Sequence, residues 1–192
     1  VEGNSFVSQT DAVAPLADGG FVTVGEHRDG GGIYITRYSS EPGTIEWVRQ
    51  ANASYTASVP EGERPMAADA IAVDGAGRIW VVGHAYGPAT FFASPSGESS
   101  WDIAAHALEQ RSVFVAVYST YGQLEFARRL STERAWDTYA VSGLDSAGRD
   151  SVWIGGAVKV PGPTEGLPAM VFGAGSPNAV FADLTPIVQS AF

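Results

Sequence analysis

The chain has 192 residues, of which 45% are hydrophobic and 23 are glycine, and its formal net charge is −10. This composition can fill a folded core and excludes general disorder. The acidic balance argues against nucleic-acid binding, because that binding depends on Lys and Arg neutralising phosphates. The absence of cysteine excludes disulfides and thiolate metal sites. No apolar stretch approaches the roughly 20 residues that span a bilayer, so we expect no membrane span.

The first strand pattern begins at Asp11 and covers residues 11–49. Short apolar runs punctuated by glycine predict strands at 11–14, 21–25, 33–38 and 45–49. Such runs, rich in β-branched and aromatic residues, favour antiparallel strands rather than βαβ units. Gly and Asp at residues 17–20 favour a tight hairpin between the first two strands. Residues 1–10 are a candidate outer strand of a preceding unit.

The same pattern returns after Asp69 and after Asp137. The second unit, 69–130, predicts strands at 69–72, 79–83, 113–118 and 124–128, with a glycine turn at 74–78. The third unit, 137–192, predicts strands at 137–140, 152–156 and 179–184, and a candidate fourth strand at 187–192. An internal period of this kind is typical of repeat architectures.

Successive four-stranded antiparallel units are typical of β-propeller blades. The sequence therefore predicts an all-β, propeller-like fold for residues 1–192, with blades at 11–49, 69–130 and 137–192. Three blades are fewer than the roughly four to eight that close a ring. We therefore expect a fragment of a larger propeller, a subunit whose partner completes the ring, or an open stack.

Residues 69–84 (DAIAVDGAGRIWVVGH), followed by 113–122 (VFVAVYSTYG), carry a resemblance to a known family. They resemble the bacterial β-propeller repeats labelled SBBP, whose pattern is AIAVDxxGNxYVTG followed by FVAKLxxxG. Those repeats occur in tandem in secreted or surface proteins, so the resemblance implies an extracellular or cell-surface bacterial protein. The gaps between second and third strands vary more in this chain than in that pattern.

The long and irregular links alternate with the tight ones. In antiparallel units this places all long links on one face, namely residues 26–32, 50–68, 84–112, 130–136 and 157–178. Function concentrates on loops held by a rigid scaffold, so this face is the predicted binding face. Within it, residues 99–111 predict a short helix with Ser100 as N-cap. Trp101 and His106 on that helix either pack on the blade or line a ligand pocket.

The candidate ligand-binding residues lie on these links and at the adjoining strand ends: His27, His84, Tyr86, Trp101, Asp102 and His106. The three unit-opening acids, Asp11, Asp69 and Asp137, are predicted to be structural latches that bond nearby backbone groups. His27 and His84 follow equivalent strand-end glycines and could hold a metal with Asp29 or Asp102. The third unit has Ala157 at that place, so we expect no metal and no cofactor.

Catalytic signatures such as Gly-x-Ser-x-Gly, His-Glu-x-x-His and the Walker loop are missing from the sequence. We therefore expect a non-catalytic interaction or structural module that binds a protein, a glycan or its own copies. The alternative is a polysaccharide lyase or hydrolase with Asp69 and Asp102 among its catalytic acids. An enzyme would bring two buried carboxylates, or a carboxylate and a histidine, into one cleft with shifted pKa values.

Overall fold

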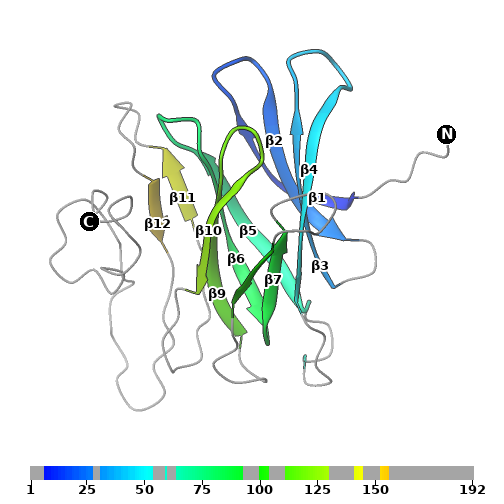
Figure 1. Cartoon of the computed structure of the whole chain (residues 1–192), viewed down its shortest axis with the longest axis vertical. Helices are drawn as coiled ribbons and strands as arrows, with labels where there is room; N and C mark the ends of the chain where they lie inside the picture. The colour runs from blue at the N-terminus through cyan, green and yellow to red at the C-terminus, as the bar shows by residue number, and fades with distance from the viewer. Residues whose placement is uncertain are drawn as a thin grey trace, which may run out of the picture.

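The computed structural model describes residues 7–27, 31–53, 59, 64–92, 100–103, 111–129, 141–144 and 152–155. The secondary structure in these ranges is all β, and every strand pair in them is antiparallel, as the sequence predicts. The strands form three sheets that lie side by side (Figure 1). Among the described residues there is no helix of the length and apolarity needed to cross a membrane.

Each sheet is built largely from neighbouring strands. Sheet A has the order β1 (Val7–Pro15), β2 (Phe21–His27), β3 (Gly32–Tyr38), β4 (Ile45–Ala53), β7 (Ala89–Phe92) and β8 (Ser100–Ile103). Sheet B has the order β10 (Leu124–Arg129), β9 (Arg111–Tyr118), β6 (Ile79–Tyr86) and β5 (Met66–Val73). Sheet C is the hairpin of β11 (Val141–Leu144) and β12 (Val152–Gly155).

Three of the hairpin turns share one geometry. The first residue of each turn is Leu16, Asp74 or Ser119. Its carbonyl oxygen accepts a hydrogen bond from the N–H of the glycine three positions later. Its own N–H donates to the carbonyl oxygen of the residue that follows that glycine. The glycine φ is 81° at Gly77 and 75° at Gly122. This is the three-residue hairpin loop that needs a left-handed residue, usually glycine. The glycine turns predicted from sequence are therefore present.

Sheets A and B also correspond in their pairing irregularities. The β1–β2 pair shifts register between Thr10 and Ala12, and the β5–β6 pair shifts between Ala68 and Ala70. The outer pairs match as well, since Tyr38 lies opposite Ile45 in sheet A and Tyr118 opposite Leu124 in sheet B, each beside a register shift. Asp11 and Asp69 are thus the extra residues of two corresponding β-bulges.

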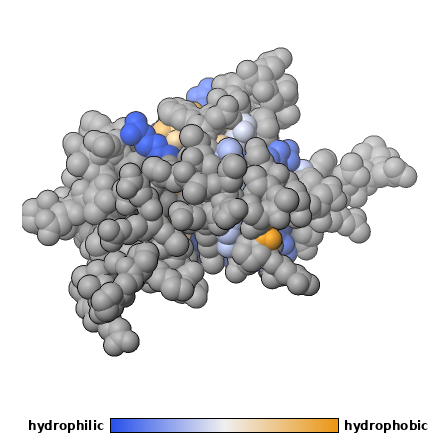
Figure 2. Space-filling model, turned by 90° about the horizontal axis from the view of Figure 1, so that it is seen from below, coloured by the Kyte–Doolittle hydropathy of each residue, from blue (hydrophilic) through white to orange (hydrophobic). Residues whose placement is uncertain are grey.

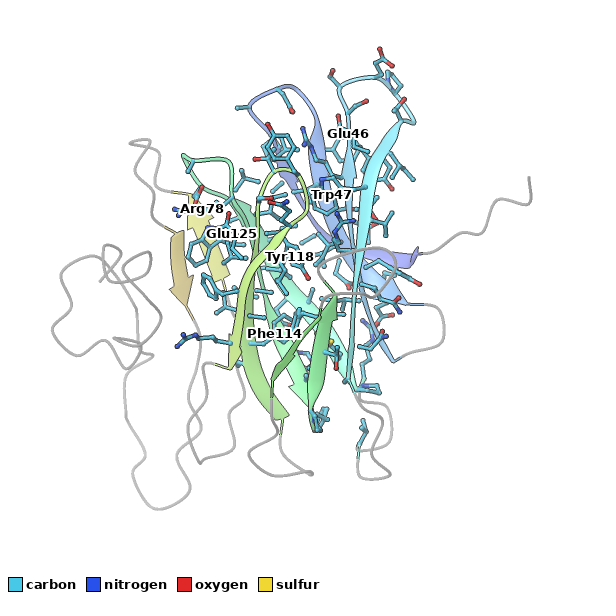
Figure 3. The ribbon with its side chains drawn as sticks, in the orientation of Figure 1. Glu46, Trp47, Arg78, Phe114, Tyr118 and Glu125 are labelled. Carbon is cyan, nitrogen blue, oxygen red and sulfur yellow. The ribbon has the colours of Figure 1, made fainter. Side chains whose placement is uncertain are left out.

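The core lies between sheets A and B. We call the face of sheet A that carries Val22 and Val24 its front face, and the face of sheet B that carries Ile79 and Val81 its back face. These two faces share one buried cluster, to which β3 adds Ile33 and Ile35 and to which β9 adds Phe114, Ala116 and Tyr118. Figure 3 shows Phe114 and Tyr118 within the body of the molecule. Alternating side chains along each strand make these two faces apolar.

Hydrogen bonds from side chains to backbone hold the two sheets together at the hairpin-turn end. Arg37 Nη1 and Trp47 Nε1 both donate to the carbonyl oxygen of Thr120, at 2.7 and 2.9 Å. Arg49 Nε donates to the carbonyl oxygen of Gly122 at 2.6 Å. We call this set of contacts on the β9–β10 turn the turn seam. Its donors come from sheet A and its acceptors from sheet B, so it fixes how the sheets are placed.

The predicted helix at residues 99–111 is wrong for the part that the structure describes. Ser100 to Ile103 form β8 and pair with β7, which in turn pairs with β4. Phe91 of β7 is fully buried and packs edge to face on Phe114 at 5.0 Å between ring centroids. This packing and the strand pairing outweigh the weak local helix preference that the sequence showed. Residues 104–110, with His106, lie outside the described residues.

The predicted strands at the two ends of the chain can be compared with the structure only in part. Val7 to Thr10 form the first part of β1 rather than a separate outer strand, and residues 1–6 are outside the described residues. In the third unit, β11 begins at Val141 and β12 covers most of the predicted strand at 152–156. The predicted strands at 137–140, 179–184 and 187–192 lie outside the described residues.

Two glycine substitutions test the turn seam. Both Gly43 and Gly122 have positive φ, but a Cβ on Gly43 would meet nothing within 4 Å, whereas one on Gly122 would lie 2.8 Å from Arg49 Nη2 and from Trp47 Cδ2. We expect Gly43→Ala to lower the free energy of unfolding by about 1 kcal/mol and Gly122→Ala by about 2 to 4 kcal/mol. Urea unfolding measures both. Equal losses would show that the seam contributes nothing.

Candidate functional site

The described titratable side chains converge where the first strands of sheets A and B meet. Strand β1 lies against β5, and the two β-bulges place Asp11 and Asp69 near enough that the charge of Asp69 acts on Asp11. Glu26 of β2, His84 of β6 and Arg64, just before β5, complete the group. We call these five residues the bulge cluster.

In sheet B the bulge acid faces an imidazole. His84 Nδ1 lies 3.2 Å from both carboxylate oxygens of Asp69 on the neighbouring strand. A carboxylate only accepts hydrogen bonds, so this geometry assigns a proton to Nδ1. The His84 side chain is almost wholly buried and that of Asp69 is mostly buried. The bulge moves Asp69 out of the regular ladder and so lets it reach the adjacent strand.

In sheet A the corresponding position next to the bulge acid is occupied by a second acid. Gly25 pairs with Thr10 as Gly83 pairs with Ala68, so Glu26 is the counterpart of His84. The guanidinium of Arg64 contacts both acids; its Nη1 forms an ion pair with Glu26 and lies 4.0 Å from Asp11 Oδ1. Arg64 comes from the sheet B side of the chain, so this contact spans the two sheets.

Asp11 is the least satisfied member of the bulge cluster. Its Oδ1 accepts a hydrogen bond from Gln9 Nε2 at 3.2 Å, but its Oδ2 is inaccessible to solvent and has no hydrogen-bond partner among the described residues. Burial raises the pKa of Asp11, and the charge of Asp69 raises it further, against the opposing effects of Arg64 and Gln9. A buried carboxylate without full hydrogen bonding costs stability in its ionised form.

A different buried carboxylate, Asp74, has a purely structural set of partners. Its Oδ1 accepts from the backbone N–H groups of Ala76 and Arg78, and its Oδ2 accepts from Arg78 Nε at 2.6 Å and Trp80 Nε1 at 2.8 Å. Both oxygens therefore serve the β5–β6 hairpin. This agrees with the glycine turn that the sequence predicts at residues 74–78.

The structure places the other sequence-predicted residues apart from the bulge cluster or leaves them undescribed. Tyr86 is buried near the end of β6, two residues after His84. The backbones of Trp101 and Asp102 lie in β8, and that of His27 ends β2, but the side chains of these three are not among those described. His106 and Asp137 lie outside the described residues. The binding role of the first group and the latch role of Asp137 stay predictions.

Sequence reasoning missed Glu26 and Arg64. Glu26 follows Gly25 as His84 follows Gly83, so the two glycines mark it in the sequence. The match between His84 and His27, two residues after Gly25, hid this correspondence. Arg64 lies in the irregular link before β5, where no strand pattern marks a position. Its role depends on how the two sheets pack and has no local signal.

The bulge cluster has the groups for proton transfer, but its exposed part is mainly Arg64, whose side chain is 44% exposed, whereas the His84 side chain is almost wholly buried. Among the described residues, no three His, Cys, Asp or Glu side chains are arranged to hold a metal ion. Figure 2 views the molecule from the end of the long links, where the coloured residues that reach the surface are mostly hydrophilic and the hydrophobic ones are small and scattered. The observed contacts are those of charges paired with one another across strands and sheets.

The raised pKa of Asp11 predicts a specific pH dependence. The folded protein holds this proton more tightly than an unfolded chain with the ordinary pKa of 3.8. Asp11 therefore favours folding below pH 3.8, and this contribution is lost as the pH rises through the folded-state pKa. As the pH rises from 3.8 to the folded-state pKa of Asp11, we expect the free energy of unfolding of Asp11→Asn to rise relative to that of the unchanged protein. Above that pKa the difference should level off.

Asp18→Asn is the matched control, because the backbone N–H of Gly20 lowers the pKa of Asp18. The stabilisation by Asp18 is present above pH 3.8 and is lost as the pH falls through the folded-state pKa. The two relative-stability curves should therefore slope in opposite directions when urea unfolding is followed from roughly pH 3 to pH 6. Parallel curves would contradict the burial of the Asp11 carboxyl.

Comparisons with known proteins found no match, so the geometry of the bulge cluster is the basis for proposing a function. Neither the models of known protein families nor the curated proteins include a match to this chain. The resemblance to SBBP repeats therefore stays a prediction from the sequence.

Proposed function

We propose that the chain is a propeller-like, non-catalytic interaction module of a secreted or surface protein. Its sheets A, B and C would be successive blades, and its long-link end would bind a protein or glycan partner. The arrangement of first strands supports this proposal: β5 lies against β1 on one side and near β11 on the other (Figure 1). Stacked antiparallel sheets with their first strands adjacent are typical of propellers.

The pairing within the bulge cluster is the observation that carries the non-catalytic assignment. Asp69 is bound to His84, and Arg64 is bound to Glu26 and lies next to Asp11. The His84 side chain is only 8% exposed, so a substrate would have to displace neighbouring groups to touch it. Charges neutralised in this way hold elements in place, and removing one partner leaves a buried charge uncompensated.

One observation favours the second candidate, a polysaccharide lyase or hydrolase. Asp11, Asp69 and His84 converge, and burial raises the pKa of Asp11, which is the direction that favours a proton donor. In this hypothesis Asp11 would act as the acid, while the Asp69–His84 pair would act as the base. The two candidate functions differ in whether a polysaccharide is bound or cleaved.

The test combines affinity electrophoresis with a product assay on the same soluble polysaccharides. For the module, we expect at most retardation of the chain, with no new reducing ends and no unsaturated sugar products. Retardation should be weakened by Trp101→Ala on the long-link end and unaffected by Tyr121→Ala on the opposite, turn end. Product release that disappears in Asp69→Asn, in a variant with an unchanged unfolding midpoint, would overturn the module in favour of the enzyme.

A further inference from the structure

The interface between sheets A and B is fastened at two diagonally opposite places. The turn seam lies at the hairpin-turn end, on the later strands β3 and β4 of sheet A and on the β9–β10 turn of sheet B. The bulge cluster lies at the long-link end, on and beside the first strands of both sheets. The shared apolar cluster lies between these two places. The two fastenings differ in chemistry.

The acceptors in the turn seam are uncharged backbone carbonyls, those of Thr120 and Gly122. The arginines that donate to them are buried, since Arg37 is 6% exposed and Arg49 is 8% exposed. Dissolved salt screens charges that face the solvent and acts much less on buried groups. We therefore expect the turn seam to be insensitive to ionic strength.

The bulge cluster joins the two sheets through ion pairs instead. Arg64 is held on sheet B, because the next residue, Pro65, accepts a hydrogen bond from the Tyr86 N–H of β6 at 2.8 Å. The Arg64 side chain reaches sheet A, where Nη1 pairs with Glu26 and lies 4.0 Å from Asp11 Oδ1. We call these two contacts of Arg64 the ionic clamp. The Arg64 side chain is 44% exposed, so salt can screen the ionic clamp.

Like charges on the two sheets oppose the ionic clamp. Asp11 of sheet A and Asp69 of sheet B are close enough for the charge of Asp69 to act on Asp11. Asp11 Oδ2 is also buried without a hydrogen-bond partner among the described residues. Parting the sheets at this end would reduce the repulsion and give Oδ2 access to water. The charge of Arg64 counters both effects, because it attracts Asp11.

We propose that loss of the ionic clamp lets sheets A and B part at the long-link end while the turn seam stays closed. Such a movement is a local opening of the folded protein, at a lower free energy than global unfolding. The end that opens is the end from which the long links leave, so ionic strength controls the shape of that surface. The proposal rests on the packing of sheets A and B and does not depend on the function proposed above.

The test uses the absence of cysteine from the chain and two matched reporter positions. Ala68 of β5 lies toward the long-link end, and Ala14 of β1 lies toward the turn end. Both belong to the shared apolar cluster, and each is 4% exposed. Ala68→Cys and Ala14→Cys therefore place one buried thiol at each end. The rate at which the thiol reacts with a dilute chromogenic disulfide reagent measures how often that end opens.

The first measurement removes the charge of the clamp. In the full chain, we expect Arg64→Gln to speed the reaction of Ala68→Cys about three- to tenfold, because it breaks a partly exposed contact and leaves the buried Asp11 charge uncompensated. The reaction of Ala14→Cys should stay unchanged. Glu26→Gln should also speed the reaction of Ala68→Cys. Glu26→Gln combined with Arg64→Gln should react no faster than Arg64→Gln alone, since both changes remove the same contact.

The second measurement leaves Arg64 in place, so it tests the clamp even if Arg64→Gln does not fold. Raising the salt concentration from about 0.05 M to about 0.5 M should speed the reaction of Ala68→Cys and leave that of Ala14→Cys unchanged. With Arg64→Gln present, salt should have little further effect. Tyr121→Cys corrects for any effect of salt on the reagent, because the Tyr121 side chain is 79% exposed.

The outcomes that overturn the proposal are distinct from its success. Equal acceleration of both reporters would show a global loss of stability, and an unchanged rate for Ala68→Cys would show that the clamp holds nothing closed. Either result overturns the clamp alone, whereas cleavage of a polysaccharide by a chain with a working clamp would overturn only the non-catalytic function.

Discussion

The placement of sheet A on sheet B depends on hydrogen bonds that side chains of one sheet donate to the backbone of the other. Arg37 and Trp47 share the carbonyl of Thr120, and Arg49 takes that of Gly122. Apolar contact alone is non-directional, so it would allow the sheets to slide over one another. Donors that reach fixed backbone carbonyls remove that freedom. Arg49, which also lies 5.3 Å from the Trp47 ring, ties the two contacts together.

Within this frame the two corresponding bulges have different chemistry. Each displaces an acid from the strand ladder, but Asp69 meets His84 whereas Asp11 meets Glu26 across the guanidinium of Arg64. Arg64 thus supplies a positive charge to both acids at the place where sheet B has the His84 imidazole. One backbone feature thus supports a pair within one sheet and a bridge between two sheets.

The sequence predicted the strands of sheets A and B well because their signals are local. Alternating apolar residues and glycine turns located β1–β6, β9 and β10, and the positive φ at Gly77 follows from its turn type. The β7–β8 hairpin was missed because its pairing partner, β4, lies far away in the sequence. Of the bulge cluster, Asp11, Asp69 and His84 were selected from sequence, whereas Arg64 acts only through the packing of the sheets.

The β7–β8 hairpin has a consequence for how the chain can be divided. It belongs to the link between β6 and β9 of sheet B, yet it extends sheet A by pairing with β4. Sheet A therefore needs a segment that comes after the first strands of its neighbour. A chain that ended after β4 would leave the β4 edge bare and prone to pairing with other chains. Cutting the chain between β4 and β5 would therefore separate sheet A from two of its own strands, β7 and β8.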